Sequence, residues 1–374
     1  MTVSSAFRRS PALPRGFACR DRDFALLPGG IVGGEQAAAA VTAGNGWPLA
    51  GGSLAFTLGS VIWREDGISW LAAAPFDELV EWAEGEGVDS VLKAIHRVGA
   101  RRPAWAGLEI DRPLVMGIVN ATPDSFSDGG ERLAPEAAVA AGLAMVAAGA
   151  DIVDVGGEST RPGAAPVAED EELARVLPVV RALATEGVAV SVDTRRAAVM
   201  SAAAAAGARI VNDIAALREP GALEAAAAGG AAVCLMHMLG EPGTMQDDPR
   251  YDCAPLDVYA FLAERLAAAE AAGIPRARIA VDPGIGFGKT TEHNAQILGA
   301  LALYHGLGCP LLLGVSRKRF VAALSAGEPP KSRLPGSLAA ALAGLDAGAQ
   351  ILRVHDVPET VQAVKVWRAM RAGG

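Results

Sequence analysis

The sequence predicts a (β/α)8 TIM barrel with an amino-terminal extension, and two observations support this prediction. From residue 113 onward, short apolar runs alternate with alanine- and leucine-rich segments of 3.6-residue periodicity. The apolar runs are continuous rather than alternating, which indicates parallel strands buried on both faces. Eight runs and eight helical segments within about 260 residues match a (β/α)8 barrel better than an open, doubly wound sheet, which stays the alternative.

Each element of the predicted barrel has a defined place in the sequence. The expected strands lie near 114–119, 151–155, 188–193, 209–213, 231–237, 279–282, 310–315 and 350–354. The expected helices lie at 135–149, 169–186, 195–206, 219–229, 256–273, 291–305, 336–347 and 358–371. Every expected strand is therefore followed by a helix, as a parallel barrel requires.

The residues before the barrel divide into two segments. Residues 1–45 are rich in Gly, Ala and Pro and have little periodicity, so we expect a flexible segment. Within 46–112, a strand or hairpin turning at Glu65–Gly67 is followed by a helical pattern at 76–99. We expect this small accessory element to pack on the barrel of residues 113–374 or on a second subunit. It has no cluster of polar residues that would give it a chemical role.

Composition excludes several classes of function. The net charge of −9 and the absence of a basic block make nucleic acid an unsuitable partner. No run of about 20 apolar residues is free of polar interruption, so no membrane span is expected. The cysteines have neither paired nor metal-ligand spacing, which fits reduced thiols in a cytoplasmic protein. The first 20 residues carry four arginines and no acid, which faintly resembles a transit peptide, but we favour a disordered terminus.

Polar residues gather where the expected strands end. The loop within Met116–Gly130 is crowded with amide, hydroxyl and carboxylate groups, and a second polar loop follows at Gly156–Gly163. The polar groups at or just beyond the strand ends are Asn120, Asp154, Glu158–Arg161, Asp193, Asn212, Asp213, His237, Asp282, Ser316, Arg317, Lys318, Arg353, His355 and Asp356. One buried Asn or Asp is commonly structural, but eight strands ending this way indicate a functional rim.

Two of these residues, Asp193 and Asp282, end their strands without an obvious partner. Carboxylates in a half-buried pocket need donors, and an aminopyrimidinone edge supplies an exocyclic amine beside a ring N–H. This chemistry matches a pterin or a guanine ring. Asn212 offers a donor and an acceptor to the same heterocycle, and Lys318 can donate to a ring nitrogen or carbonyl.

A second group brings an amide, a guanidinium and an imidazole together on neighbouring strands. Asn120, Arg353 and His355 suit a diphosphate, and barrels often hold phosphate near their last strands. The glycine-rich segment Asp282–Thr290 ends in Gly-Lys-Thr like a phosphate-binding P-loop. Its leading glycine position holds Pro283, however, so a turn that approaches a ring is the better interpretation.

Taken together, these motifs resemble the dihydropteroate synthase family. The matching stretches occur in family order and cover essentially all of 113–374, whereas 1–112 falls largely outside the resemblance. They are Met116–Gly130, Asp154–Gly163, Val190–Thr194, Ile210–Ile214, Met236–Gln246, Val281–Asn294, Gly314–Lys318, Gly336–Ala341 and Arg353–Val357.

The resemblance implies a transferase of folate biosynthesis. It would join 4-aminobenzoate to 6-hydroxymethyl-7,8-dihydropterin diphosphate, releasing diphosphate and forming dihydropteroate. The residues carried over for the pterin and diphosphate are Thr160, Asp193, Asn212, Asp282, Lys318, Arg353 and His355. Among them, the expected catalytic groups are Asp193, Lys318, Arg353 and His355. The 4-aminobenzoate side would consist of Ser159, Arg161, Pro162 and Phe287, and Asn120 would bind the Mg²⁺ that accompanies diphosphate.

Two alternatives remain at this point. A pterin-dependent methyltransferase would share the barrel and the pterin acids, but it would not need the loop at Ser159–Pro162 or the Arg353-Val354-His355 motif. A catalytically silent paralogue acting as an assembly subunit should have lost some of the polar strand ends, and none is lost. The apolar late helices and the family resemblance lead us to expect a homodimer.

Overall fold

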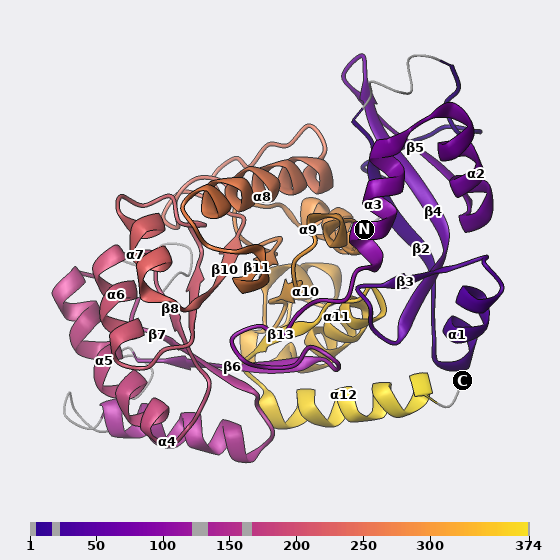
Figure 1. Ribbon diagram of the computed structural model, residues 1–374. Helices are drawn as coiled ribbons and strands as arrows, with labels where there is room; N and C mark the ends of the chain where they lie inside the picture. The colour runs from indigo at the N-terminus through magenta and orange to yellow at the C-terminus, as the bar shows by residue number, and fades with distance from the viewer. Residues whose placement is uncertain (1–4, 17–22, 122–133, 159–166, 373–374) are drawn as a thin grey trace.

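The computed structural model describes residues 5–16, 23–121, 134–158 and 167–372. It contains a barrel from about residue 114 to the carboxyl end and a smaller amino-terminal unit beside it (Figure 1). No helix in these described ranges combines the length and the apolar composition that crossing a lipid bilayer requires.

The barrel is a ring of eight parallel strands. In chain order they are β6 (Leu114–Asn120), β7 (Ile152–Gly156), β8 (Val190–Asp193), β9 (Ile210–Asp213), β10 (Ala232–Met236), β11 (Ile279–Asp282), β12 (Leu312–Leu313) and β13 (Ile351–Val354). The sheet order is β11-β10-β9-β8-β7-β6-β13-β12, and a parallel bridge between Val281 and Leu311 joins its two ends. The predicted (β/α)8 architecture is therefore confirmed.

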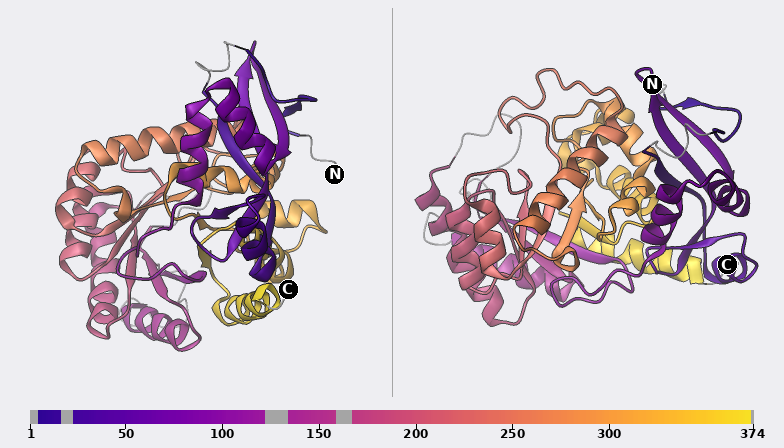
Figure 2. Two further views of the ribbon diagram at one scale, coloured as in Figure 1. Left: turned by 45° about the vertical axis from the view of Figure 1, so that its right-hand side comes forward. Right: turned by 45° about the horizontal axis from the view of Figure 1, so that its top comes forward.

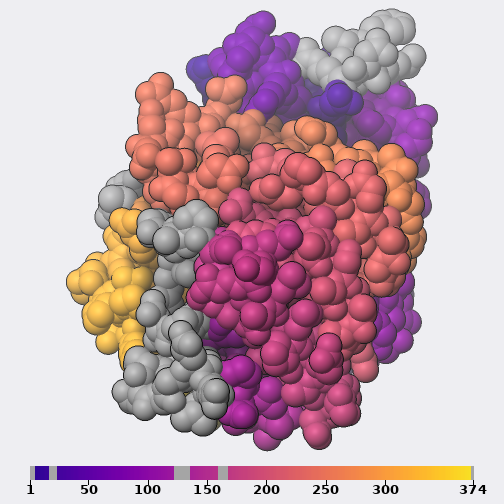
Figure 3. Space-filling view, turned by 90° about the vertical axis from the view of Figure 1, so that its left-hand side faces the viewer, coloured from indigo at the N-terminus to yellow at the C-terminus, as the bar shows by residue number. Residues whose placement is uncertain are grey.

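Helices surround this ring. They are α4 (Ala134–Ala147), α5 (Glu169–Thr185), α6 (Ala197–Ala205), α7 (Ala222–Gly229), α8 (Ala254–Ala271), α9 (Thr291–Gly299), α10 (Arg319–Leu324), α11 (Leu334–Asp346) and α12 (Val357–Ala372), with a 3₁₀ segment η4 (Leu301–Leu307) after α9. Figure 3 faces the outer surface that α4 to α7 cover, with the amino-terminal unit at the top. Between the strands and these helices lies a core of Val, Ala and Leu side chains.

The two-residue periodicity of the strands decides which side chains face the inside of the barrel. In β7, Val153 and Val155 pack in the outer core, whereas Ile152 belongs to the cluster inside the ring. Asp154 therefore points inward. In β8, Val190 and Val192 pack outward, so Asp193 faces the interior.

Trp105 closes the amino end of the barrel. It is fully buried within the interior cluster, and its Nε1 donates to the carbonyl oxygen of Arg278 at 3.1 Å. A short antiparallel bridge to Leu108 holds the turn that presents the indole. The barrel interior is thus filled from this end, and its polar groups lie at the opposite end.

The amino-terminal unit has its own sheet and core. Its strands are β1 (Arg8–Arg9), β2 (Ala25–Gly33), β3 (Trp47–Leu49), β4 (Leu54–Glu65) and β5 (Ile68–Pro75), in the order β1-β5-β4-β2 with β3 also paired to β4. Its helices are α1 (Gly34–Thr42), α2 (Phe76–Glu86) and α3 (Asp89–Gly99). One side of the sheet buries an aromatic-rich core that includes Phe56 and Phe76.

The hairpin at Glu65–Gly67 and the helices at 76–99 lie where the sequence places them. The structure differs from the expectation of a flexible segment up to residue 45, because residues 25–42 form β2 and α1. β2 pairs antiparallel with β4 from Ala25 to Gly33, so a partner strand stabilises a segment whose Pro and Gly content hides its strand pattern.

The amino-terminal unit packs on one side of the barrel (Figure 2). Ile62 and Leu71 of its sheet form a buried cluster with Leu303 of η4. One face of the sheet therefore covers the core of the unit, and the other packs on the barrel near α8 and η4. Helix α1 of the same unit contacts α12.

Candidate active site

Several of the polar residues predicted for the rim lie at paired positions across adjacent strands. In the sheet register, Asn120 of β6 is opposite Gly156 of β7, Gly156 is opposite Asp193 of β8, and Asp193 is opposite Asn212 of β9. Because parallel strands run in one direction, these positions form one row at the carboxyl end of the ring.

Arg353 of β13 binds two carboxylates on the strands of this row, Asp154 of β7 and Asp193 of β8. Its Nε donates to Asp154 Oδ2 at 2.6 Å, and its Nη2 donates to Asp193 Oδ2 at 2.6 Å. Asn212 also donates to Asp154 Oδ2, at 3.1 Å. Asp154 is fully buried, and its second oxygen has no hydrogen-bond partner among the described residues. A buried polar network thus exists before any substrate is considered.

The electrostatics of this network keep Asp193 close to its titration point. Burial raises the pKa of Asp193 to about 7, the positive charge of Arg353 opposes this rise, and the nearby Asp154 and Asp213 add to it. For Arg353, burial alone would lower the pKa, but the carboxylates of Asp154 and Asp193 outweigh it and raise the pKa above its ordinary value. The Asp193 side chain keeps 11% of its surface exposed, so a ligand can reach it.

Asp282 and Lys318 meet on the other side of the barrel mouth. A Cβ added to Gly314 would lie 3.7 Å from Lys318 Nζ, 3.9 Å from Asp282 Oδ2 and 3.9 Å from Arg353 Cβ, so these three side chains surround one glycine. Asp282 Oδ1 accepts a hydrogen bond from the Gly284 backbone at 2.7 Å. Lys318 donates to the Ile285 carbonyl, and its Nζ lies 4.6 Å from the centre of the Phe287 ring.

Burial shifts both of these groups toward their neutral forms. It raises the pKa of Asp282, against the positive charge of Lys318 and the Gly284 hydrogen bond. It lowers the pKa of Lys318 to about 8, against the negative charge of Asp282. The mouth of the barrel therefore contains two carboxylates and one ammonium that titrate closer to neutrality than they would in water.

The glycine-rich segment after β11 is a tight turn, as the Pro283 substitution in the P-loop pattern predicts. Gly284 has φ +66°, and a Cβ there would lie 1.9 Å from the His237 carbonyl oxygen. Buried Lys289 ties the turn together, because its Nζ lies 2.8 Å from His237 Nδ1 and donates to the carbonyls of Gly284 and Phe287 at 2.9 Å each. The amino group of Lys289 thus serves the turn rather than a phosphate.

His355 lies beyond β13 and contacts Ser316. The His355 backbone N–H donates to Ser316 Oγ at 3.2 Å, and its Nδ1 lies 3.1 Å from the same oxygen. The adjacent Arg317, which has φ +58°, pairs with Asp356 through two hydrogen bonds. The segments after β12 and β13 are therefore held to each other at the rim, with Ser316 fixing the imidazole.

The residues predicted for the second polar loop, Ser159, Thr160, Arg161 and Pro162, lie outside the described residues. The described residues at the two ends of that loop, Glu158 and Val167, are joined by hydrogen bonds. Val167 N donates to Glu158 Oε1 at 3.1 Å, and Arg196 donates to Glu158 and to the Val167 carbonyl. Arg196 also contacts buried Glu172 at 2.5 Å, and burial raises the pKa of that carboxyl.

The donor set at the rim fits a metal ion that arrives with its substrate. No group of three or more His, Cys, Asp or Glu side chains suited to a metal occurs in the described parts of the chain. Asn120 offers a half-buried amide oxygen at the end of β6, which is a ligand that Mg²⁺ accepts when substrate phosphates supply others. The residues present therefore fit Mg²⁺ bound mainly through a phosphate group.

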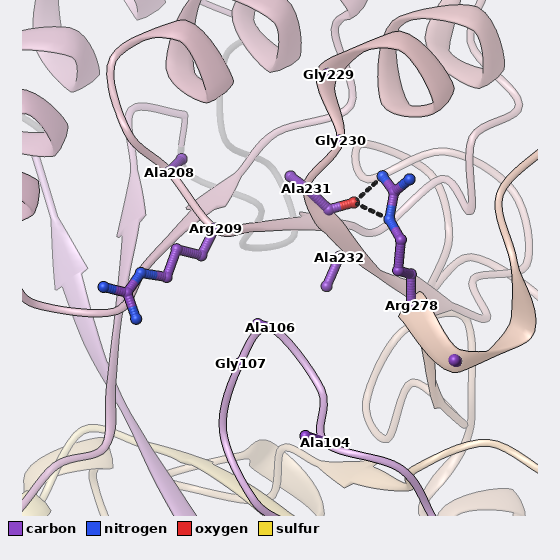
Figure 4. Close-up of a pocket in the computed structure, with 11 residues that line it drawn as sticks. Ala104, Ala106, Gly107, Ala208, Arg209, Gly229, Gly230, Ala231, Ala232 and Arg278 are labelled. Atoms are coloured by element: carbon purple, nitrogen blue, oxygen red, sulfur yellow. Dashed lines mark hydrogen bonds between the residues drawn. The ribbon is translucent and has the colours of Figure 1, made fainter.

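A separate cavity of about 490 Å³ lies at the opposite, amino end of the barrel (Figure 4). Ala104, Ala106 and several small residues around the start of β10 line it. Arg278 at its edge donates to the Ala231 carbonyl, with Nε at 3.1 Å. This cavity has no carboxylate and does not adjoin the polar strand ends.

Sequence reasoning named Asp154 among the strand ends but gave it no role, and it did not separate Ser316 from its neighbours. Asp154 proves to be the acceptor shared by Arg353 and Asn212. The signal available for it was an acid in the middle of an apolar strand, with Val on either side. Gln246, which donates to the Gly286 carbonyl at 2.7 Å, had no such signal.

Comparison with known proteins agrees with this geometry. Residues 116–355 match the family described as pterin binding enzyme. The chain is 51% identical over 263 residues to the dihydropteroate synthase of Escherichia coli (strain K12), covering 70% of this chain and 93% of that protein. It is 46% identical over 263 residues to the dihydropteroate synthase of Haemophilus influenzae, with coverage of 70% and 95%.

Two solved structures are similar over the barrel. Dihydropteroate synthase from Xanthomonas albilineans with 4-aminobenzoic acid has a TM-score of 0.68 at 52% identity, covering 71% of this chain and 97% of that one. The same organism's enzyme in complex with 7,8-dihydropteroate has a TM-score of 0.65 at 49% identity, with coverage of 71% and 96%. On these grounds the chain belongs to the dihydropteroate synthase family.

Proposed function

We propose that the chain condenses 6-hydroxymethyl-7,8-dihydropterin diphosphate with 4-aminobenzoate, forming dihydropteroate and diphosphate for folate biosynthesis. The observation that carries this proposal is the pair of buried carboxylates, Asp193 and Asp282, facing one barrel mouth together with Arg353 and Lys318. Solved relatives contain 4-aminobenzoic acid or 7,8-dihydropteroate, which are the second substrate and the product of this reaction.

The pterin ring is held by the inner row of polar groups. Asp193 and Asp282 accept hydrogen bonds from its exocyclic amine and ring N–H groups, which satisfies carboxylates that burial otherwise penalises. Asn212 donates and accepts along the same edge, and Lys318 donates to a ring nitrogen or carbonyl. The preformed contacts of Arg353 keep Asp193 oriented before the ring arrives.

The reaction needs a stabilised leaving group and no covalent nucleophile. The bond between the methylene carbon and the diphosphate oxygen breaks, and the electron-rich dihydropterin delocalises the positive charge left on that carbon. The aminobenzoate nitrogen then forms the new C–N bond and loses a proton. Carboxylates beside the ring favour this cationic species electrostatically, which is the role of Asp193 and Asp282 in catalysis.

Arg353 and His355 take up the negative charge that develops on the departing diphosphate. Asn120 would hold Mg²⁺ together with the phosphates, and the ion would supply further positive charge there. Thr160 adds a hydroxyl donor to the same group. On the outer side, Phe287 provides an apolar wall for the aromatic ring of 4-aminobenzoate, together with Ser159, Arg161 and Pro162.

The last helix and the cysteines support a proposal for assembly and location. The last helix exposes Val366 and Met370, with 55% and 73% of their surfaces accessible, so a second copy could cover this apolar strip and form a homodimer. The three described cysteines are buried free thiols, which fits a cytoplasmic enzyme.

Diphosphate release tests the reaction directly. The purified chain, mixed with the pterin diphosphate and Mg²⁺, should release diphosphate and form dihydropteroate only when 4-aminobenzoate is added. Chelating the Mg²⁺ should reduce the rate, and excess Mg²⁺ should restore it. A silent assembly subunit would release nothing under any of these conditions. Methyl transfer to a corrinoid protein without release of diphosphate would instead identify a pterin-dependent methyltransferase.

A further inference from the structure

The amino-terminal unit lies outside the residues that match the family, yet it touches the elements on both sides of the glycine-rich turn. This turn lies between β11 and α9 and carries Phe287. The connection from β10 to α8 packs on one side of it, and η4 follows α9 on the other. The amino-terminal sheet contacts both α8 and η4.

An ion pair joins the sheet to the start of α8. Arg64, near the end of β4, pairs with Asp257 in the first turns of that helix. The second oxygen of Asp257 accepts a hydrogen bond from the backbone N–H of Cys253 at 3.0 Å, and Cys253 is the residue that caps α8. One carboxylate thus binds the amino-terminal unit and fixes the start of the helix at the same time.

Apolar and thiol contacts surround this pair. Partly buried Leu256 of α8 packs against the buried cluster that contains Ile62 of β4. The Cys253 thiol lies 3.6 Å from the carbonyl oxygen of Ala6, in the bend before β1. The start of α8 is therefore held on one side by the amino-terminal unit and on the other by the barrel core.

Two residues before Cys253, the same connection reaches the active-site turn. The Tyr251 hydroxyl donates to the Gly288 carbonyl at 2.7 Å. The Tyr251 ring lies edge-on to His293 of α9, with 4.8 Å between ring centres. Gly288 has φ +60°, and a Cβ there would lie 2.5 Å from the Leu239 carbonyl oxygen, so the backbone of the turn presses against this connection without slack.

We propose that the amino-terminal unit braces the aminobenzoate side of the active site, with Arg64 and Asp257 fixing the start of α8 and Tyr251 holding Gly288, and with it Phe287, in place. All three are positioning residues, and none touches the reacting atoms. This inference rests on the proposed function for its kinetic consequence. The contacts themselves run from a unit that the compared synthases do not cover to a turn that they share.

The arrangement predicts an effect on one substrate only. The pterin acids are held by Arg353 and by the Gly284 backbone, neither of which belongs to the brace. Phe287, by contrast, is next to Gly288 in sequence. Loosening the start of α8 should therefore raise the KM for 4-aminobenzoate, while kcat and the KM for the pterin diphosphate stay nearly unchanged.

The test uses the full chain with Arg64→Ala, Asp257→Asn and Tyr251→Phe. Each should raise the KM for 4-aminobenzoate about fivefold, and Arg64→Lys should restore most of the loss. Arg101→Ala is the control, because Arg101 is an exposed arginine after α3 whose ion pair is a loose one with Glu109, at 3.9 Å. That control should behave like the unmodified chain.

A double-mutant cycle separates transmission from general loosening. If Arg64 acts through Tyr251, the combined variant should raise the KM by clearly less than the product of the two single increases. Hydrogen exchange provides a readout that needs no activity, because Arg64→Ala should speed exchange of the amides in 287–290 and leave those of α5 unchanged.

The outcomes distinguish the two proposals. An unmodified chain that releases no diphosphate contradicts the proposed function, and the exchange experiment then still decides whether the brace exists. Unchanged exchange at 287–290 overturns the brace. In an active chain, three further results would overturn the brace. The KM for 4-aminobenzoate could stay unchanged in all three variants, or both KM values could rise equally. The third is a double variant whose KM rises by the full product of the two single increases.

Discussion

The barrel and the amino-terminal unit differ most in what they bury. Within the described residues, the buried polar and charged side chains begin at Arg102 and continue through the barrel, where Asp154, Asn212 and Asp282 sit at strand ends. The amino-terminal core instead contains or contacts four of the six tryptophans, and Trp47 stacks on Phe76 there. Because burying a polar group costs free energy unless it is satisfied, its presence marks the region where function requires it.

Each region should therefore respond to substitution in its own way. Substitutions among the polar strand ends should change rates, and substitutions among the apolar contacts should change stability. The brace through Arg64 is the one place where we infer that the second region acts on the first. The following experiments challenge this division, beginning with the largest expected effect.

Asp193→Asn should lower kcat by about a thousandfold while the chain stays folded, because it removes the negative charge that we propose favours the pterin cation. The carboxamide keeps the size of the side chain and can still meet Arg353 through its oxygen. Steady-state kinetics with both substrates, together with thermal unfolding, measure the two quantities. A rate within a few fold of the unmodified chain would remove Asp193 from the mechanism.

Asp213→Asn is the matched control on the next strand. Asp213 is fully buried, and both its oxygens accept backbone hydrogen bonds, from Ala215 and Leu217 at 2.7 Å each. This substitution should lower the free energy of unfolding by roughly 1–3 kcal/mol and change kcat much less than Asp193→Asn does. If both variants lost the same activity, position along the rim rather than contact with the pterin would explain the loss.

The sequence predicts the barrel and the positions of its polar residues because both depend on local patterns. Continuous apolar runs mark the strands, and the row Asn120, Asp193, Asn212 follows from where these runs end. The resemblance to a family then adds the chemical identity of the ligands. The pairing of each cationic side chain with a particular carboxylate does not follow from local patterns.

Long-range pairing could not be predicted from one sequence. Arg353 and Asp154 are 199 positions apart, and only closure of the ring brings β13 next to β6 and β7 within reach. Likewise, β2 exists because β4 pairs with it, and the brace depends on an ion pair that spans 193 positions. In each of these pairs, the sequence around one partner gives no indication of which residue is the other.

Trp105→Ala should lower the free energy of unfolding by about 3 kcal/mol, because it leaves a large cavity at the closed end of the barrel. Chemical denaturation at constant slope measures this loss. At a temperature where the variant is folded, kcat and both KM values should match the unmodified chain, since the polar strand ends lie at the other end. A change in either KM would show that the two ends of the barrel are not independent.

The pH dependence of kcat/KM for the pterin diphosphate should be bell-shaped. Asp193, whose pKa burial raises to about 7, must be ionised to accept hydrogen bonds, so the value should fall as pH drops below 7. Lys318, whose pKa burial lowers to about 8, must be protonated to donate, so the value should also fall as pH rises above 8. Each limb should approach tenfold per pH unit.

Lys318→Arg sharpens this reading, because a guanidinium stays charged across the range. The alkaline limb should move to higher pH while the acid limb stays where it is, whatever the absolute rate. An alkaline limb that does not move would assign it to another group and leave Lys318 as a ring donor without a titrating role.

The smallest effect is expected where the second polar loop leaves the barrel. Arg196→Lys keeps a positive charge beside buried Glu172 but loses the fork that also reaches the Val167 carbonyl and Glu158. Because Glu158 and Val167 at the two ends of the loop are then less firmly joined, the substitution should raise the KM for 4-aminobenzoate about threefold. Ser159–Pro162 of this loop are proposed to contact that substrate.

Arg195→Lys is the control for this loop, because Arg195 contacts Glu158 at 3.4 Å and Glu219 at 3.1 Å but makes no contact with Val167. Its KM for 4-aminobenzoate should stay within the error of the unmodified chain. If Arg195→Lys and Arg196→Lys raised that KM equally, general electrostatics at the rim would account for both. A rise confined to Arg196→Lys would instead show that joining the two ends of the loop is what matters, since only Arg196 binds both of them.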